Sequence, residues 1–361
     1  MLLLLFAASL AACADSQSSV VQGSVIKGCT PAEFPPGTFS QCRFTEPGLP
    51  ARDYYVYAPS TLKPGPVPLV VYLHGCTQTA PDAAAGVRWN ELAERHGFIV
   101  AYPEQYAPAP DQDQVDDGNG SGCWNWFRPE HINRGSGEPA TIAGIARAVM
   151  GAYDIDPARV YILGASAGGS MSSAVGASYP DLFAAIAIVA GTPYAGADLD
   201  GELAAQAMGE FARVMPVMVI HGTSDEAALF PLGVAAVQQW LGTDDRVDDG
   251  AENGSIARTP EAIEHHGFDP SLIAGLGQLG DVCLDGSRGV PCPAGALGLD
   301  SYPYSIAHYL DALGQPLVDF WVIHGSGHTY VGGDRRGSFT DPHGPDITTA
   351  AYEFFLAHPM E

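Results

Sequence analysis

Basic residues are scarce in this sequence. Lys27 and Lys63 are its only lysines, and its 361 residues include 41 Asp and Glu against 16 Lys and Arg, which gives a formal net charge of -25. Proteins that bind the phosphate backbone of nucleic acids or an anionic membrane surface do so through basic patches. We therefore expect neither nucleic acid nor an anionic membrane surface as a partner.

Common metal-binding motifs are also missing. Neither a C-x-x-C nor an H-E-x-x-H spacing occurs, and these spacings are typical of zinc sites. The acidic segment 107–122 carries several aspartates, but Val115 stands where an EF-hand loop needs an oxygen ligand. We expect a solvated acidic loop there, no bound metal and no cofactor.

The apolar run at residues 2–10 is too short to span a bilayer and has the shape of a signal peptide. It ends in LAAC at 10–13, which is similar to a bacterial lipobox with Cys13 as the lipidated residue. We expect an extracellular protein or a cell-surface or outer-membrane lipoprotein of a bacterium, with a lipid on Cys13 as its only membrane contact. Cleavage a little further on, followed by free secretion, is the alternative.

Cysteine usage favours the same oxidising location. Apart from Cys13 the chain has six cysteines, an even number that suits three disulfides. Nearness in the sequence predicts two pairs, and the remaining cysteines form the third: Cys29–Cys42, Cys283–Cys292 and Cys76–Cys123.

The stretch RVYILGASAGG at 159–169 says most about function. A β-branched apolar run ends in G-x-S-x-G at 164–168, and a run of small residues with a helical pattern follows. A serine on so tight a turn between strand and helix needs glycines two positions before and after it, because side chains there would collide with neighbouring elements. The pattern is a nucleophile elbow with Ser166 as the candidate nucleophile. The alternative is that Ser166 only caps the helix.

A serine nucleophile needs a histidine base and an acid that orients this base. An apolar run at 215–220 leads into HGTSD, which makes Asp225 the candidate acid, and another at 318–323 leads into HGSGHTY, which makes His328 the candidate base. The order Ser166, Asp225, His328 is that of the α/β-hydrolases. The alternatives are an ordinary turn residue for Asp225 and a loop histidine without chemistry for His328.

Acyl transfer also needs an oxyanion hole made of backbone amides. One donor is the amide after the nucleophile, here Ala167, and the second comes from an earlier loop at a strand end. The strand expected at 68–73 runs into HGCTQ, so we assign the second donor to the amide of Cys76.

The chain predicts an α/β-hydrolase fold, a mostly parallel sheet with helices on both faces. We expect residues 1–13 to be a signal or lipobox region, 14–50 an N-terminal extension, and 51–361 a single catalytic domain. Besides the strand before Ser166, we expect strands at 54–57, 68–73, 98–102, 183–189, 215–220 and 318–323, and helices at 84–96, 139–153, 167–178 and 347–358.

A segment rich in Gly, Pro and Asp at 242–299 predicts a long surface excursion between the acid and the base, where it could cover the site as a partial lid. Trp124 and Trp126 lie close in sequence to the other such segment, at 107–122, and we expect them to line a substrate cleft. Packing in the core or a loop is the alternative for both.

Several motifs together resemble the poly(3-hydroxybutyrate) depolymerase family of esterases, which includes secreted feruloyl and acetylxylan esterases. The resemblance covers about residues 50–357. The motifs are LHGCTQ at 73–78, YPEQ at 102–105, CWNWF at 123–127, GASAGG at 164–169, HGTSD at 221–225, GSGHTYVGG at 325–333 and GSFTDPHGPDITTAAYEFF at 337–355. Carried over by position, the family's triad is Ser166, Asp225 and His328, and Cys76 lines its oxyanion hole.

The resemblance implies a secreted or lipid-anchored serine hydrolase of carboxylic esters, acting through an acyl-enzyme on polyhydroxybutyrate or its oligomers. Secreted polyester depolymerases usually carry a substrate-binding domain after the catalytic domain, and this sequence ends at Glu361. We therefore favour two other kinds of substrate over solid polymer. One is soluble oligomers, and the other is plant cell-wall esters, which are the substrates of feruloyl and acetylxylan esterases. A peptidase and a surface binding protein without activity are more distant alternatives.

Overall fold

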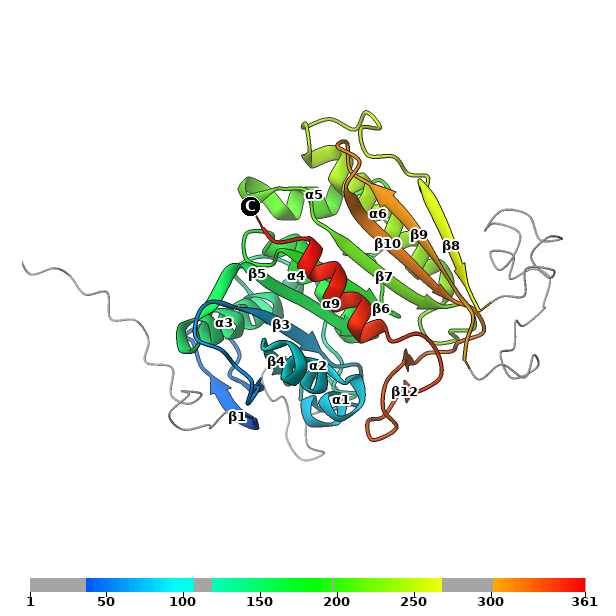
Figure 1. Ribbon diagram of the computed structural model, residues 1–361. Coiled ribbons are helices and arrows are strands. Elements are labelled where there is room, and N and C mark those ends of the chain that lie inside the picture. The colour runs from blue at the N-terminus through cyan, green and yellow to red at the C-terminus, as the bar shows by residue number, and fades with distance from the viewer. Residues whose placement is uncertain (1–36, 107–118, 197, 268–300, 361) are drawn as a thin grey trace, which may run out of the picture.

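The apolar runs in the middle of the chain form the central strands of a ten-stranded sheet (Figure 1). The computed structural model describes residues 37–106, 119–196, 198–267 and 301–360. Across the sheet the strands follow the order β1 (Thr38–Phe44), β2 (Arg52–Ala58), β4 (Ile99–Pro103), β3 (Val67–Leu73), β5 (Ile155–Ala165), β6 (Ala185–Val189), β7 (Val217–Gly222), β10 (Pro316–Ile323), β9 (Tyr304–Leu310) and β8 (Ala262–His266).

Every pairing from β4 to β10 in this order is parallel. Antiparallel strands extend both sides, with β2 and β1 beyond β4 and with β9 and β8 beyond β10. A parallel centre needs helical crossovers, which cover its faces. The structure confirms the expected mostly parallel sheet with helices on both faces.

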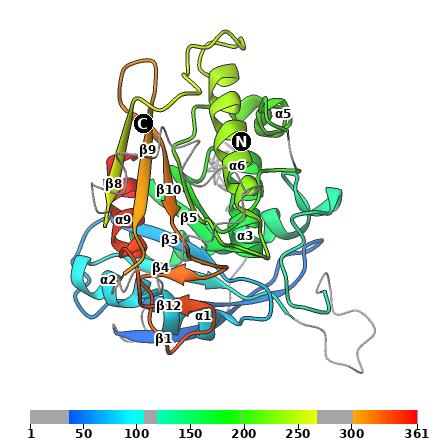
Figure 2. The same cartoon turned by 90° about the vertical axis from the view of Figure 1, so that its right-hand side faces the viewer.

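The sheet separates two hydrophobic cores, because side chains alternate along each strand. On β3, Leu69, Val71 and Leu73 face one core, and Val70 and Tyr72 face the other. The first core is covered by α3 (Gly137–Ala152), α4 (Ala167–Ser178), α5 (Glu202–Met208) and α6 (Phe230–Val247), and the second by α1 (Ala80–Val87), α2 (Trp89–His96) and α9 (Ile347–Ala357). Figure 2 shows α6 and α3 on one side of the sheet and α9 and α2 on the other.

Short elements complete the fold: β11 (Tyr330–Val331), which pairs with β12 (Thr340–Asp341), and the 3-10 helices η1 (Pro129–His131) and η2 (Gly209–Phe211). Among the described helices, none is both long and apolar enough to cross a membrane.

The helix expected at 84–96 is two helices. Arg88 adopts the left-handed conformation, with φ 60°, and this ends α1 and turns the chain into α2. We expected the catalytic domain to begin at residue 51. The sheet begins earlier in the chain, because β1 at residues 38–44 pairs with β2 along its whole length.

The polar excursion begins later than residue 242. Residues 242–247 continue α6, and Gly242, Asp244 and Asp245 are buried there. A Cβ on Gly242 would lie 2.4 Å from the Asp200 carbonyl oxygen, so this glycine permits close packing and does not mark a loop. Beyond α6, β8 joins the edge of the sheet, and residues 268–299 of the expected excursion lie outside the described residues.

The start of α4 lies directly against the end of β3. A Cβ on Gly168 would be 2.0 Å from the Leu73 carbonyl oxygen and 2.7 Å from that of His74, and a Cβ on Gly164 would be 2.4 Å from the Gly168 carbonyl carbon. Real Cβ atoms do not approach backbone so closely. The two glycines of the elbow therefore allow the nucleophile turn and the loop after β3 to meet.

We predict that Gly168→Ala lowers the free energy of unfolding by about 3 kcal/mol or more, because backbone would have to move to admit the methyl group. The matched control is Gly151→Ala, also in a helix, where the new Cβ meets nothing within 4 Å. Gly151→Ala should raise the free energy of unfolding by about 0.5–1 kcal/mol. Denaturant unfolding measures both, and equal stabilities for the two variants would contradict the close contact.

Candidate active site

Ser166 occupies the sharp turn between β5 and α4. Its φ of 57° and ψ of -121° are unfavourable for a residue with a Cβ. The turn is held by the Ser166 amide, which donates to the Val189 carbonyl oxygen at 2.8 Å. This strained backbone presents the Ser166 side chain to a cavity at the carboxyl ends of the parallel strands.

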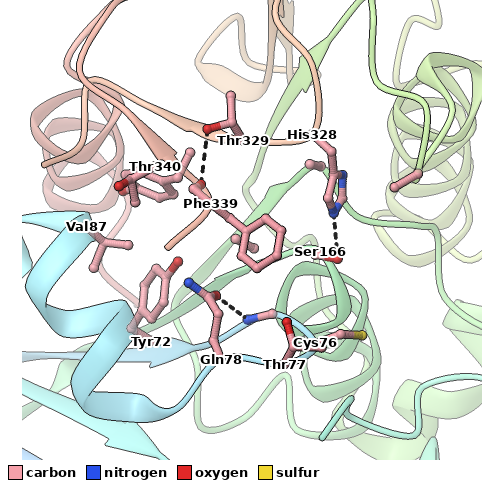
Figure 3. Close-up of a pocket in the computed structure, with 15 residues that line it drawn as sticks. Tyr72, Cys76, Thr77, Gln78, Val87, Ser166, His328, Thr329, Phe339 and Thr340 are labelled. Carbon is pink, nitrogen blue, oxygen red and sulfur yellow. Dashed lines mark hydrogen bonds between the residues drawn. The ribbon is translucent and has the colours of Figure 1, made fainter. Parts of the chain in front are cut away.

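The structure brings Ser166, His328 and Asp225 together in one chain of hydrogen bonds. His328 Nε2 lies 2.8 Å from Ser166 Oγ (Figure 3), and His328 Nδ1 lies 2.8 Å from Asp225 Oδ2. Asp225 follows β7 and His328 follows β10, two neighbouring parallel strands. With its Nδ1–H donating to Asp225, the imidazole keeps Nε2 free to accept the Ser166 proton.

Asp225 is held as a carboxylate. Its Oδ1 accepts hydrogen bonds from the amides of Ala227 at 2.9 Å and Ala228 at 2.8 Å, and its side chain has no exposed surface. Burial by itself would raise the pKa of Asp225, but the hydrogen bonds from His328 and these two amides outweigh it and lower the pKa below its ordinary value. The acid therefore orients His328 with a negative charge.

Two other strand-end histidines are engaged away from the nucleophile. His221 Nε2 contacts the Ala228 carbonyl oxygen at 2.6 Å, and burial lowers the His221 pKa. His324 Nε2 contacts Ser305 Oγ at 2.8 Å, and burial lowers the His324 pKa to about 4. Burial thus disfavours a charge on both, and both support the loops that carry Asp225 and His328.

The loop after β3 faces the nucleophile. A Cβ on Gly75 would lie 3.3 Å from Ser166 Cβ, and Cys76 lines the same cavity as Ser166. The Ala167 amide is the first of α4, where a helix leaves its N–H groups without helical acceptors. The loop of Cys76 and the amide of Ala167 thus both lie next to Ser166, and their two amides remain the candidate oxyanion donors.

The loop after β3, residues 74–78, is named the oxyanion loop after its candidate donor Cys76, and it is fixed by side chains whose roles the sequence did not reveal. Gln78 Oε1 accepts from the Gly75 amide at 2.9 Å. His74 is buried, with Nδ1 2.8 Å from the Gly75 carbonyl oxygen, and its Nε2 accepts from the Gln105 amide at 2.9 Å. The motifs LHGCTQ and YPEQ contain these residues, but only the fold shows that they contact each other.

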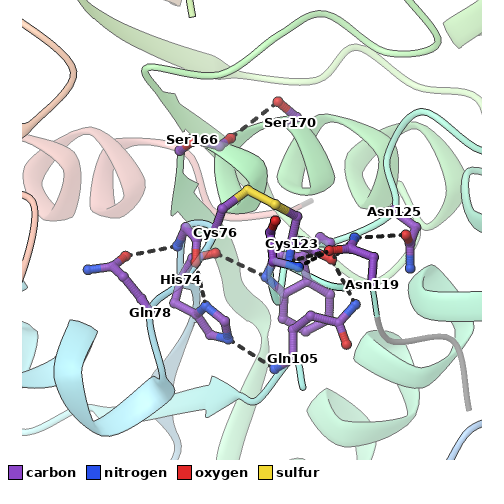
Figure 4. Close-up of a disulfide and its surroundings, with 12 residues drawn as sticks. His74, Cys76, Gln78, Gln105, Asn119, Cys123, Asn125, Ser166 and Ser170 are labelled. Carbon is purple, nitrogen blue, oxygen red and sulfur yellow. Dashed lines mark hydrogen bonds between the residues drawn. A yellow bond between two sulfur atoms is a disulfide. The ribbon is translucent and has the colours of Figure 1, made fainter. Parts of the chain in front are cut away.

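A disulfide joins Cys76 of this loop to Cys123, 47 residues away (Figure 4). The neighbouring Thr77 amide donates to the Ser121 carbonyl oxygen at 2.7 Å, so the two loops are also joined by backbone. Among the other cysteines with predicted roles, Cys13, Cys29, Cys283 and Cys292 lie outside the described residues, and Cys42 lies on β1.

A buried carboxylate organises the Cys123 loop. Glu138 of α3 accepts from the Asn125 amide at 2.6 Å, from Asn125 Nδ2 at 2.8 Å and from Gln105 Nε2, and its Oε1 lies 3.5 Å from a nitrogen of the buried Arg52. Burial raises the Glu138 pKa to about 7, although these hydrogen bonds and the Arg52 charge oppose the shift. No motif pointed to this residue.

The cavity beside Ser166 has a volume of about 270 Å³. Besides Ser166, His328 and residues 75–78 of the loop after β3, its walls include Tyr72, Val87, Ala190, Thr329, Tyr330, Phe339 and Thr340. The expectation that Trp124 lines a substrate cleft is wrong. Trp124 is 0% exposed and donates from Nε1 to the His74 carbonyl oxygen at 3.1 Å, so it supports the oxyanion loop from the core. Trp126 is half-buried against the same core and Phe127, away from these walls.

Phe339 is one of three aromatic residues that line the cavity and that the sequence did not single out. It is 56% exposed, and its φ of 54° is strained for an aromatic residue. Two hydrogen bonds to its carbonyl oxygen hold it, from the Tyr330 amide at 2.9 Å and from Thr329 Oγ1 at 3.1 Å. The adjacent Ser338 carbonyl oxygen accepts from Gln78 Nε2 at 2.9 Å, which links this wall to the oxyanion loop.

No group of three or more His, Cys, Asp or Glu residues that could hold a metal ion occurs in the described ranges of the chain. The arrangement around Ser166 is suited to nucleophilic catalysis, with Ser166, His328 and Asp225 supplying nucleophile, base and orienting acid.

A parallel sheet with a serine at the elbow after β5, a carboxylate after β7 and a histidine after β10 defines an α/β-hydrolase. The family model described as esterase PHB depolymerase matches residues 52–254, more than half of the chain. The protein belongs to this family.

Similar proteins include poly(3-hydroxyalkanoate) depolymerase C of Paucimonas lemoignei, 43% identical over 141 residues, which are 39% of this chain and 31% of that protein. Feruloyl esterase B of Neurospora crassa is 34% identical over 142 residues, 39% of this chain and 44% of that protein. The matches thus span less than half the length of these two relatives. Among solved structures, an acetyl xylan esterase from Aspergillus awamori has a TM-score of 0.58 at 19% identity and covers 88% of this chain and 99% of its own, which shows a shared fold.

We predict that the double variant Cys76→Ser/Cys123→Ser loses more than tenfold in ester turnover per folded molecule, because the loop that carries the candidate oxyanion donor Cys76 is no longer fixed by the disulfide. It should also lose about 4 kcal/mol of unfolding free energy, the value expected for closing a loop of this length. Reductant should lower the activity of the wild type toward that of the variant and leave the variant's activity unchanged. Wild-type turnover in the folded variant would contradict the role of the tether.

The raised Glu138 pKa predicts a pH-dependent stability. Between pH 4.5, the ordinary pKa of a glutamate, and about pH 7, the folded protein holds a proton on Glu138 that the unfolded chain releases. The stabilisation that results from this proton is therefore full below pH 4.5 and is lost as the pH rises through 7. Relative to Glu138→Gln, the wild type should lose about 3 kcal/mol of unfolding free energy between pH 4.5 and pH 8.

Denaturant unfolding of both proteins at several pH values measures this difference. Glu210→Gln, at an exposed position, is the control and should follow the wild type at every pH. A constant difference between wild type and Glu138→Gln would show that the buried carboxyl group does not titrate in this range.

Proposed function

We propose that this protein is a serine carboxylic ester hydrolase that acts through an acyl-enzyme. The observation that carries the proposal is the continuous hydrogen-bonded chain from Ser166 through His328 to Asp225. The family match and the ester-hydrolysing names of the relatives support it.

The geometry suits the following steps. His328 Nε2 takes the proton of Ser166 Oγ as this oxygen attacks the ester carbonyl carbon. The amides of Cys76 and Ala167 donate to the carbonyl oxygen as it becomes negative. His328 then gives the proton to the departing alcohol. In the second half, His328 accepts a proton from water, the resulting hydroxide attacks the acyl-enzyme, and the acid leaves as Ser166 regains its proton.

The substrate we favour is polyhydroxybutyrate or its oligomers, since the depolymerase match has the higher identity of the two relatives described. Feruloyl or acetylxylan esters of plant cell walls are the second candidate, which the similarity to feruloyl esterase B supports. The aromatic rings of Tyr72, Tyr330 and Phe339 around the cavity also suit an aromatic acyl group.

We place the protein outside the cytoplasm, as a secreted protein or one anchored through a lipid on Cys13. The disulfide between Cys76 and Cys123 supports an oxidising compartment. A surface binding protein without activity is disfavoured by the intact hydrogen bonds of all three candidate catalytic side chains.

Hydrolysis of 3-hydroxybutyrate oligomers, suspended polyhydroxybutyrate, methyl ferulate and p-nitrophenyl esters tests the proposal. We predict that Ser166→Ala lowers turnover of every active substrate by about 10⁴-fold or more and abolishes labelling by a fluorophosphonate probe. Ser172→Ala is the matched control, a buried serine of the same helix α4 whose hydroxyl bonds the Gly168 carbonyl oxygen, and it should remain active and labelled.

A preference for hydroxybutyrate substrates would support the depolymerase assignment, and a preference for ferulate would replace it with the cell-wall esterase. Turnover that is absent, or that persists in Ser166→Ala, would overturn the proposed function.

A further inference from the structure

The cavity beyond Ser166 is apolar except for a few oxygen and nitrogen atoms. Val87, Ala190 and the rings of Tyr330 and Phe339 supply its hydrocarbon surface. In such a surrounding each polar group either has a hydrogen-bond partner or costs free energy.

Most polar side chains of the walls are already engaged within the protein. Thr340 Oγ1 donates to the carbonyl oxygens of Asp334 and Gly337, and Thr329 Oγ1 donates to that of Phe339. Gln78 is used by the Gly75 amide and the Ser338 carbonyl oxygen. None of these groups needs a ligand.

Tyr330 is also committed. Thr348 Oγ1 donates to the Val87 carbonyl oxygen at 2.7 Å, so the Tyr330 hydroxyl donates to Thr348 Oγ1 at 2.8 Å. Its ring lines the cavity, but its hydrogen points away into the protein.

Tyr72 differs from Tyr330 in the hydrogen bonding of its hydroxyl. It is 1% exposed, and its hydroxyl has no hydrogen bond with any residue of the described chain. Figure 3 shows the hydroxyl directed into the space between Val87 and Phe339. Burial raises the Tyr72 pKa well above its ordinary value, so the hydroxyl keeps its proton and can both donate and accept. Thr77 also lines the cavity and carries a hydroxyl group, but this residue is exposed to solvent.

We propose that Tyr72 is a specificity-determining residue whose hydroxyl bonds an oxygen carried by the acyl group beyond the ester carbonyl. This inference rests on the proposed ester hydrolysis. A site with a buried hydroxyl favours a substrate that satisfies it and disfavours an analogue that leaves it without a partner.

Two kinds of acyl group carry such an oxygen. A 3-hydroxyacyl group has it close to the ester carbonyl, and a 4-hydroxycinnamoyl group has it at the far end of an aromatic ring. Two matched substrate pairs separate these sources: p-nitrophenyl 3-hydroxybutyrate with p-nitrophenyl butyrate, and methyl 4-hydroxycinnamate with methyl cinnamate.

The measurement is the ratio of kcat/KM within each pair. The wild type should prefer the hydroxylated member of one pair by about tenfold or more, and Tyr72→Phe should reduce this ratio to near one. Tyr330→Phe is the control, because it removes a hydroxyl from the same cavity that already has a partner, and it should keep the wild-type ratio. Thermal unfolding of each variant shows whether it is folded.

The inference is overturned if the wild type discriminates in neither pair, if Tyr72→Phe lowers both members equally, or if Tyr330→Phe abolishes the preference as well. Failure of the proposed function gives a different result, since no substrate would then be turned over in a Ser166-dependent way.

Discussion

The contact of Gly168 with the carbonyl oxygen of Leu73 is the constraint on which the site depends. It brings the first turn of α4 against the end of β3, closer than any residue with a side chain allows. Because β3 continues into the oxyanion loop and α4 begins just after Ser166, this one contact sets where the nucleophile lies relative to the candidate donors. Every residue of α4 is buried, since this helix packs against β3, β5 and β6 of the sheet and against its neighbours α3 and α5.

A second, electrostatic constraint acts from the opposite side of the oxyanion loop. The buried Glu138 carboxyl group accepts hydrogen bonds from the Asn125 amide and the Gln105 side chain and forms an ion pair with the buried Arg52. Gln105 contacts His74 through its amide, and Cys123 reaches Cys76 through the disulfide. The loop is thus held by close packing on one side and by a buried polar network on the other, as a preorganised group of donors requires.

The contact among Ser166, His328 and Asp225 was predictable because each of these residues belongs to a short local motif and the three motifs follow a known order along the chain. The β5 strand, Ser166 and α4 follow from one short pattern, and the acid and base follow from their positions after apolar strands. The rest depended on contacts between distant residues. Nothing in the sequence marks the left-handed conformation of Arg88 that divides α1 from α2. The polar residues at 242–247 predicted a loop, but this segment is helical, and Asp244 is buried there and accepts a hydrogen bond from the Met215 amide. Trp124 looked equally suited to a cleft or a core, and only its burial decides between them.

The cavity wall and the catalytic groups come from separate parts of the chain. Phe339 and Thr340 belong to a segment that rests on α1, where Ser338 donates from its amide to Asp82, while Ser166, Asp225 and His328 follow strands of the central sheet. A change of side chain at position 339 or 340 alters the shape of the cavity and leaves the hydrogen bonds among Ser166, His328 and Asp225 in place. The fold therefore allows the shape of this cavity to diverge while the three hydrogen-bonded side chains stay the same, and the similar proteins carry names as different as poly(3-hydroxyalkanoate) depolymerase C and feruloyl esterase B.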